Sequence, residues 1–157
     1  MRVKTWVLAV VSVAVFFGGI ALASGLGYWK TTTEKVPVAI SSGEYAGQAD
    51  PMDIRGSYTF ADIAKSFDLP IDQLGAAFGV ENPDSFKCKD LESLYGDLEG
   101  IEIGTASVRY FVALYVGIPV DDAQTAELPR SAADVLLGLG TLDDAQAEQL
   151  AQHTVDP

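Results

Sequence analysis

The sequence predicts an all-α protein in which a single N-terminal transmembrane helix precedes a small bundle of five or six short helices. Three observations predict this fold class. The run Trp6–Trp29 holds twenty-four residues without a charge. Between Ile54 and Val155, apolar residues recur at helical spacing between capping and stop signals. The roughly 100 residues of this second region are enough for one independent hydrophobic core.

The uncharged run is long enough to cross a bilayer, which requires about 20 helical residues. The alternative is a secretory signal peptide, because basic residues precede the run and Ala21–Ala23 forms a small-residue cleavage pattern. The run exceeds the roughly 7 to 15 apolar residues of a signal peptide. It also ends at Tyr28 and Trp29, whose rings suit the headgroup layer. We therefore expect residues 1–30 to be a retained anchor with a short N-terminal tail, contacting the lipid bilayer through residues 6–29.

The orientation of this anchor follows from its short N-terminal tail, because two basic residues lie close to each end of the run and give almost no charge bias. A tail of this kind usually stays in the cytoplasm. We therefore expect a single-pass protein of the inner (cytoplasmic) membrane with an extracytoplasmic C-terminal domain. Gly19, Ala23 and Gly27 recur every four residues, a spacing that lets transmembrane helices approach closely, although small residues are common in such helices.

Composition divides the remaining chain into a linker at residues 31–53 and an acidic helical domain at residues 54–157. The linker is rich in Thr, Ser, Gly and Pro and has no helical period. Within it, Val36–Ile40 could add a strand to the sheet of a partner, although Pro37 disfavours this.

The domain has a strongly negative charge. From Asp50 onward, six basic residues stand against twenty acidic ones, a formal charge of −14. Such a surface argues against nucleic acid as a partner. It favours either simple solubility or the steering of a cationic soluble protein, such as a basic electron carrier.

Capping and stop signals place the predicted helices of the domain. A Thr59–Asp62 capping box begins the first. The others are predicted as follows: Ile71–Phe78 stopped by Gly79, Asp90–Tyr95 closed by Gly96, a central apolar helix from Thr105 ended by Pro119, a helix with Pro129 in its first turn, and a last helix with a Thr141–Asp144 capping box. The expected core consists of Phe60, Ile63, Phe67, Leu74, Phe78, Leu94, Val108, Phe111, Val112 and Tyr115.

Residue types argue against DNA binding and against iron–sulfur or structural zinc sites. Thr59–Val80 has the outline of a helix-turn-helix, but its second helix lacks the basic side chains of a DNA reader. The single cysteine, Cys88, cannot close an internal disulfide or hold a cluster alone. It lies between Lys87 and Lys89, so it is either a thiol of lowered pKa or an incidental one.

No catalytic constellation is apparent, and we expect neither an enzyme nor a cofactor or metal. The carboxylate pairs Asp121–Asp122 and Asp143–Asp144 lack calcium-loop spacing and suit helix starts. His153, the only histidine, is expected on a frayed C-terminus. Arg109 interrupts the central apolar helix, where it either pairs with an acid such as Glu102, offers a forked donor to a partner, or covers the core with its stem.

Two stretches carry a family resemblance: IRGSYTFADIA through LPIDQLGAAFGV at Ile54–Val80, and EIGTASVRYFVALY at Glu102–Tyr115. They resemble the helical C-terminal region of some NapH-like, four-iron-cluster membrane proteins of anaerobic bacteria and archaea. Leu128–Arg130, Leu142 and His153–Val155 fit the same region. The resemblance covers about two-thirds of the chain, but the chain has a single apolar run and no cysteine-rich ferredoxin motif.

The resemblance implies a prokaryotic, stand-alone accessory domain beside a membrane redox or transport complex. Together with the charge and the apolar run, it predicts a non-catalytic accessory or scaffold subunit of a larger membrane assembly. The alternative is a docking module for a small molecule or a cationic electron carrier, recognised through Arg109 and the acidic surface.

Overall fold

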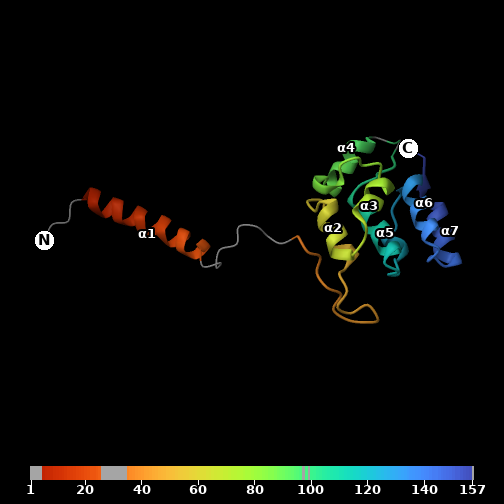
Figure 1. Cartoon of the computed structure of the whole chain (residues 1–157), viewed down its shortest axis with the longest axis horizontal. Helices are drawn as coiled ribbons and strands as arrows, with labels where there is room; N and C mark the ends of the chain where they lie inside the picture. Colours follow the sequence, from red (N-terminus) through yellow and green to blue (C-terminus); the bar gives the residue numbers. More distant parts are fainter. Residues whose placement is uncertain (1–4, 26–34, 97, 99, 157) are drawn as a thin grey trace. The chain divides into compact units, whose positions relative to one another are not determined.

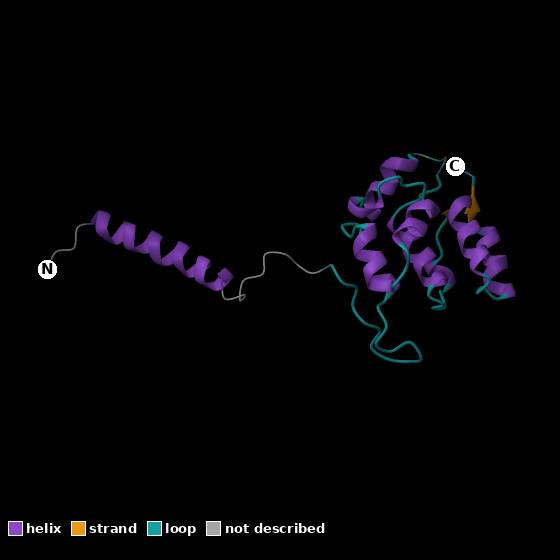
Figure 2. Ribbon diagram, viewed as in Figure 1, coloured by secondary structure: helices purple, strands orange, loops and turns teal. Residues whose placement is uncertain are grey.

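The computed structural model describes residues 5–25, 35–96, 98 and 100–156, in two compact units, Met1–Glu34 and Lys35–Pro157. Seven α-helices and one pair of two-residue strands lie in these ranges, which confirms the predominantly helical fold class (Figures 1 and 2). Residues 1–4 of the predicted anchor, its last residues 26–30 and residues 31–34 of the predicted linker lie outside the described ranges. The second unit begins at Lys35, ahead of the Ile54 boundary that composition suggested.

Helix α1, Thr5–Gly25, makes up the described part of the first unit. It contains no acidic residue in its first turn and no basic residue in its last. Its described large side chains are exposed: Trp6, Val10, Val11, Val13, Val15, Phe16, Phe17 and Leu22. By length and hydropathy together, none of the helices in the described ranges qualifies as a membrane-crossing segment.

The second unit opens with an arm, residues 35–50, which forms the loop that extends from the helices in Figure 1. Ala39 and Ala49 form an antiparallel bridge, and the amide of Asp50 donates to the carbonyl of Val38 at 2.9 Å. Asp53 accepts from the Val38 amide at 2.9 Å, and Lys35 lies 3.4 Å from Asp62. The segment considered as a strand for a partner's sheet therefore pairs within its own chain.

The first two helices of the domain begin where the sequence predicts, and the second ends one residue earlier than predicted, at Ala77. In α2, Phe60–Phe67, the Asp62 amide donates to the Thr59 hydroxyl at 3.2 Å, and the Thr59 amide donates to the Asp62 carboxylate at 2.8 Å. These two bonds confirm the capping box. Helix α3, Ile71–Ala77, is followed by Gly79 with a left-handed φ of 62°.

Helix α5, Thr105–Tyr115, lies at the centre of the core, as predicted. Every residue from Ser107 to Leu114 is buried except Arg109. Short elements surround it: the 3₁₀ turns η1 (Pro51–Asp53), η2 (Pro83–Ser85), η3 (Cys88–Asp90) and η4 (Asp122–Gln124), and helix α4 (Leu91–Tyr95). Turn η3 includes Asp90, so the helix predicted as Asp90–Tyr95 starts one residue later, at Leu91.

The C-terminal part pairs two helices with two short strands. Strand β1, Leu128–Pro129, leads into α6, Arg130–Leu139, and α7, Asp144–Gln152, leads into β2, Thr154–Val155. The strands are parallel, with Leu128 opposite Thr154. Two predictions are wrong here. The C-terminus is not frayed, and α7 is capped by Asp143 with Gln146 rather than by Thr141 with Asp144, because the helix begins at Asp144 itself.

The core is built around edge-to-face aromatic contacts. Phe78 lies 5.5 Å from Phe111 and 5.9 Å from Phe60 between ring centroids, and Phe60 lies 5.4 Å from Phe86. Leu94, predicted for the core, is 51% exposed, because it lies on the outer face of the short helix α4. Phe67 and Tyr115 pack only partly buried against the core. Buried residues that the prediction omitted include Ile54, Tyr58, Leu69, Leu91, Ile103, Tyr110, Leu128, Leu136 and Leu150.

Candidate functional site

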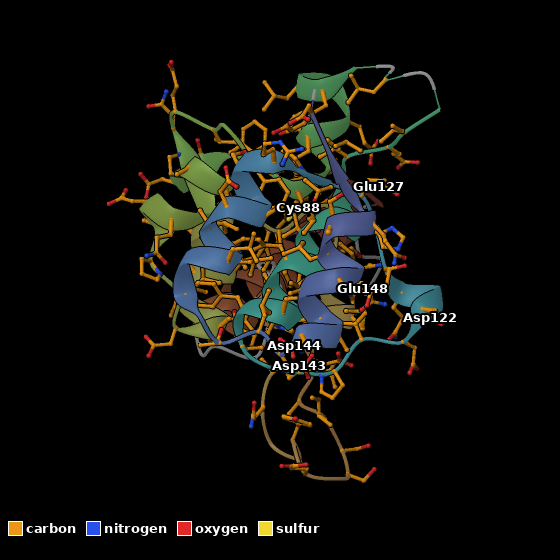
Figure 3. The ribbon with its side chains drawn as sticks, turned by 90° about the vertical axis from the view of Figure 1, so that its right-hand side faces the viewer. Cys88, Asp122, Glu127, Asp143, Asp144 and Glu148 are labelled. Carbon is orange, nitrogen blue, oxygen red and sulfur yellow. The ribbon has the colours of Figure 1, made fainter. Side chains whose placement is uncertain are left out.

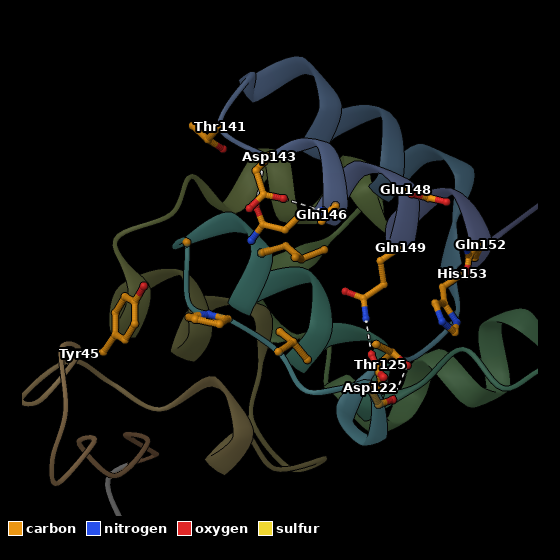
Figure 4. Close-up of a pocket in the computed structure, with 15 residues that line it drawn as sticks. Tyr45, Asp122, Thr125, Thr141, Asp143, Gln146, Glu148, Gln149, Gln152 and His153 are labelled. Atoms are coloured by element: carbon orange, nitrogen blue, oxygen red, sulfur yellow. Dashed lines mark hydrogen bonds between the residues drawn. The ribbon is translucent and has the colours of Figure 1, made fainter.

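An open groove of about 910 Å³ lies beside α7. In Figure 4, α7 runs along one side of the groove and the segment that carries Asp122 and Thr125 lies across from it. The floor includes Leu114, Pro119 and Val120. The remaining lining is mainly polar: Tyr45, Asp122, Thr125, Thr141, Asp143, Gln146, Glu148, Gln149, Gln152 and His153.

The charged lining of the groove is acidic. Figure 3 shows Asp122, Asp143 and Glu148 around α7 on this side of the domain. Two of these carboxylates also hold the local structure. Asp143 accepts from the Gln146 amide at 2.8 Å, and Asp122 accepts from the Gln149 side chain at 3.3 Å. Asp143 therefore caps a helix start, as acids at such positions were expected to do, and Asp122 contacts α7, which was not predicted; both add negative potential to the groove.

One end of the groove is formed by His153, which contacts two residues behind the lining. Its Nδ1 lies 3.2 Å from Oε1 of Glu127, and its ring meets the ring of Tyr110 edge-on at 6.3 Å between centroids. Tyr110 is fully buried on α5, and its hydroxyl has no hydrogen-bond partner among the residues that the structure describes. Burial, reinforced by the Glu127 carboxylate, raises the pKa of the Tyr110 phenol.

No sequence signal points to the cluster of Tyr110, Glu127 and His153. Twenty-six positions separate Glu127 from His153, so no local spacing rule relates them. Tyr45 of the arm also lines the groove, from a segment interpreted as linker. The parallel pairing of β1 with β2 lies directly beside the contact between His153 and Glu127.

Arg109 lies away from this groove and acts within the domain. Its Nε donates to the carbonyl of Ile54 at 2.7 Å, and it forms no salt bridge with Glu102. The side chain is half-buried. The hydrogen bond from the Val38 amide lowers the pKa of the Asp53 carboxyl. Partial burial opposes this shift, and the charges of Arg55 and Arg109 add to it. Arg109 therefore joins α5 to the start of the domain, and the pairing with Glu102 that we considered is wrong.

Cys88 is an inert, buried thiol. It has no exposed surface, and its Sγ donates to the carbonyl of Tyr58 at 3.3 Å. Burial raises the pKa of the Cys88 thiol to about 12, against a smaller lowering by backbone hydrogen bonding and by Arg109. The neighbouring lysines do not activate it, because burial outweighs their charge. The incidental thiol is confirmed.

The small residues of the apolar run are only partly described. Gly19 lies exposed in α1, with open space for at least 4 Å around the place where a Cβ would lie, and Ala23 lies one turn further along the same helix. Gly27 lies outside the described residues. Helix pairing through these residues stays a prediction.

The described residues were predicted to hold neither a metal site nor a serine nucleophile, and two observations bear on this. No group of three or more His, Cys, Asp and Glu side chains that could hold a metal ion occurs there. Ser107 is buried, and its hydroxyl accepts from the Gly104 amide at 3.2 Å, so it supports the start of α5. The groove presents negative potential, amide side chains and a few apolar side chains to a bound partner.

No protein-family model, curated protein or solved structure matched this chain.

Proposed function

We propose that the protein is a non-catalytic, single-pass accessory subunit of a larger membrane complex, acting through an extracytoplasmic helical domain. The main observation behind the proposal is that one chain contains an uncharged apolar segment and a strongly acidic region. Twenty-four uncharged residues, Trp6–Trp29, precede a region of formal charge −14. An uncharged apolar segment is stable in a bilayer, whereas a strongly acidic region is stable in water.

The physical character of α1 supports an anchor. Its described large side chains, including Val13, Phe16 and Phe17, are exposed, and α1 lies in a compact unit of its own. Exposed apolar surface of this extent is typical of segments that contact lipid or another protein. The uncharged run continues to Trp29, beyond the end of α1 at Gly25.

The inferred partner is a membrane redox or transport complex. This inference depends on the resemblance of Ile54–Val80 and Glu102–Tyr115 to the accessory region of NapH-like proteins. The chain has a single cysteine, and it is buried, so electron transfer through a cluster would belong to the partner. The domain would then contribute binding surface rather than chemistry.

Membrane extraction tests the anchor. The full-length chain, produced in a bacterial host, is expected to remain in the membrane pellet after alkaline carbonate washing. In a Val13→Lys/Phe17→Lys variant each lysine adds about 2.5 to 3.5 kcal/mol to the cost of insertion, so the chain is expected in the supernatant. A Val13→Leu/Phe17→Leu variant is the matched control and should stay in the pellet. Release of the wild-type chain by carbonate would reject the anchor.

A reporter enzyme tests the orientation. Alkaline phosphatase is active only outside the cytoplasm, so its fusion after residue 157 is expected to be active in intact cells. An inactive, stable fusion would place the domain in the cytoplasm and reject this part of the proposal.

The acidic groove favours a second candidate function, the docking of a cationic soluble protein such as an electron carrier. Its charged lining includes Asp122, Asp143 and Glu148, within a domain of formal charge −14. Salt distinguishes the two functions. Steering by charge weakens sharply as ionic strength rises, whereas an apolar interface with a membrane subunit largely survives.

A further inference from the structure

Strand β2 and the residues beside it are attached to β1, α6 and α7. The Leu128 amide donates to the carbonyl of His153 at 2.8 Å, and the Thr154 hydroxyl donates to the carbonyl of Leu150 at 2.6 Å. Arg130 forms a forked pair with Asp156, with its second nitrogen 2.8 Å from Oδ2. Both strand residues, Thr154 and Val155, are only partly buried. Val155 also packs against the core, so both polar and apolar contacts hold the strand.

His153 provides the contact that responds to pH in the physiological range. It is the only histidine of the chain, and imidazole side chains ordinarily titrate at about pH 6.5. Its Nδ1 lies 3.2 Å from the Glu127 carboxylate, and the two side chains are 30% and 32% exposed. A protonated imidazole makes a charge-assisted hydrogen bond to this carboxylate, whereas a neutral imidazole makes an ordinary one.

The charged and titratable groups around His153 come from every neighbouring element. Glu127 precedes β1, Tyr110 lies on α5, Asp122 on η4 and Glu148 on α7, while Arg130 pairs with Asp156. Of these groups, only Arg130 is cationic, and its charge is matched by Asp156. The ion pair with Glu127 is charged only when the imidazole is protonated, so the contact is charge-assisted when the imidazole carries a proton and an ordinary hydrogen bond when it is neutral.

We propose that His153 is a pH-responsive latch: its protonation fastens β2 to β1 and fixes the end of the groove beside α7, and its deprotonation loosens both. The coupling to the groove follows from position, since Gln152 and His153 line it directly. The buried Tyr110 hydroxyl, which lacks a partner among the described residues, lies on the element behind the histidine ring. This inference does not depend on membrane anchoring or on the proposed partner.

Amide hydrogen exchange of the full-length chain in detergent micelles, followed by NMR, tests the latch. The reporter is the Leu128 amide, which donates to His153, and the control is the Cys88 amide, which donates to Tyr58. Intrinsic exchange rates are first corrected for pH. The protection of the Leu128 amide is then expected to fall about two- to tenfold from about pH 5.5 to about pH 7.5, which is the size of effect expected when one hydrogen bond is weakened or lost. The protection of Cys88 is expected to stay constant.

Two variants make the test specific. His153→Gln keeps an amide that can donate to Glu127 but does not titrate, so the protection of Leu128 is expected to become independent of pH. Glu127→Gln removes the carboxylate and with it the charge-assisted bond, so the protection of Leu128 is expected to become independent of pH in this variant too. The latch is overturned if the wild-type protection of Leu128 does not change with pH, or if either His153→Gln or Glu127→Gln retains the change.

Discussion

At the residue scale, the aromatic contacts at the centre of the domain contribute much of its stability. Phe111 is fully buried on α5 and meets Phe78 edge-to-face and Tyr115 at a tilt. Its position was predictable, because it lies on the most apolar predicted helix. Leu94 and Tyr110 were not predictable, since their exposure depends on how neighbouring elements pack rather than on the pattern of one helix.

Truncation of Phe111 measures this core directly. Phe111→Ala is expected to lower the free energy of unfolding by about 3 to 5 kcal/mol, through lost burial and a residual cavity. The matched control is Leu94→Ala, whose side chain is 51% exposed and which should cost far less. Chemical denaturation followed by circular dichroism gives both values. Equal shifts of the two midpoints would contradict the core assignment.

The buried thiol of Cys88 predicts a loss of stability at alkaline pH. The ordinary pKa of the thiol is 9.0, and burial raises it to about 12 in the folded domain. Between these two values the unfolded chain releases a proton that the folded chain retains, so the free energy of unfolding falls as pH rises. Below about pH 9 the effect is absent. In Cys88→Ala the same pH series is expected to give a shallower slope, and an identical slope would contradict the burial of a neutral thiol.

At the element scale, the starts of helices were predictable wherever a side chain within three residues satisfies the first amides. The Thr59–Asp62 capping box is of this kind, and both of its hydrogen bonds form. For α7 the sequence predicted a Thr141–Asp144 capping box, and this prediction was wrong. The helix begins at Asp144, and Asp143 caps it.

Two substitutions test which cap is used at α7. Asp143→Ala removes the acceptor for the Gln146 amide and is expected to cost about 0.5 to 2 kcal/mol of stability. Thr141→Ala changes an exposed residue outside the helix and is expected to have almost no effect. Thermal unfolding of the two variants side by side measures the difference. A larger loss for Thr141→Ala would contradict the observed cap.

The Thr59–Asp62 capping box predicts an acid dependence of stability. Burial opposes ionisation of Asp62, but the hydrogen bonds from Thr59 and the charge of Lys35 outweigh it and lower the pKa of the carboxyl. Its stabilising contribution is therefore complete above the ordinary value of 3.8 and is lost as pH falls through the lowered value. In Asp62→Asn, the decline of the free energy of unfolding below about pH 4 is expected to be less steep than in the wild-type chain. Parallel declines in the two proteins would reject this role of the ionised carboxylate.

Contacts between elements distant in sequence were not predictable. The pairing of β1 with β2 and the bond between Glu127 and His153 each join residues about 26 positions apart. Both depend on how α6 and α7 return the chain, and no composition or spacing in either segment specifies that path. The same reasoning applies to Tyr45, which reaches the groove from the arm.

At the scale of the whole molecule, the chain combines two regions that require different surroundings. An uncharged run of twenty-four residues precedes a domain whose charged residues from Asp50 onward are mostly acidic. The domain contains no assembled metal site or activated thiol in its described residues. Its surface includes the groove beside α7, whose lining is mainly polar.

Purification from native membranes tests the accessory-subunit proposal most directly. A chain carrying a C-terminal affinity tag is solubilised in mild detergent and purified at low and at moderate salt, and the co-purifying proteins are identified and quantified by mass spectrometry. The proposal predicts stoichiometric subunits of one membrane redox or transport complex at both salt concentrations. Recovery of the chain alone under both conditions would contradict it.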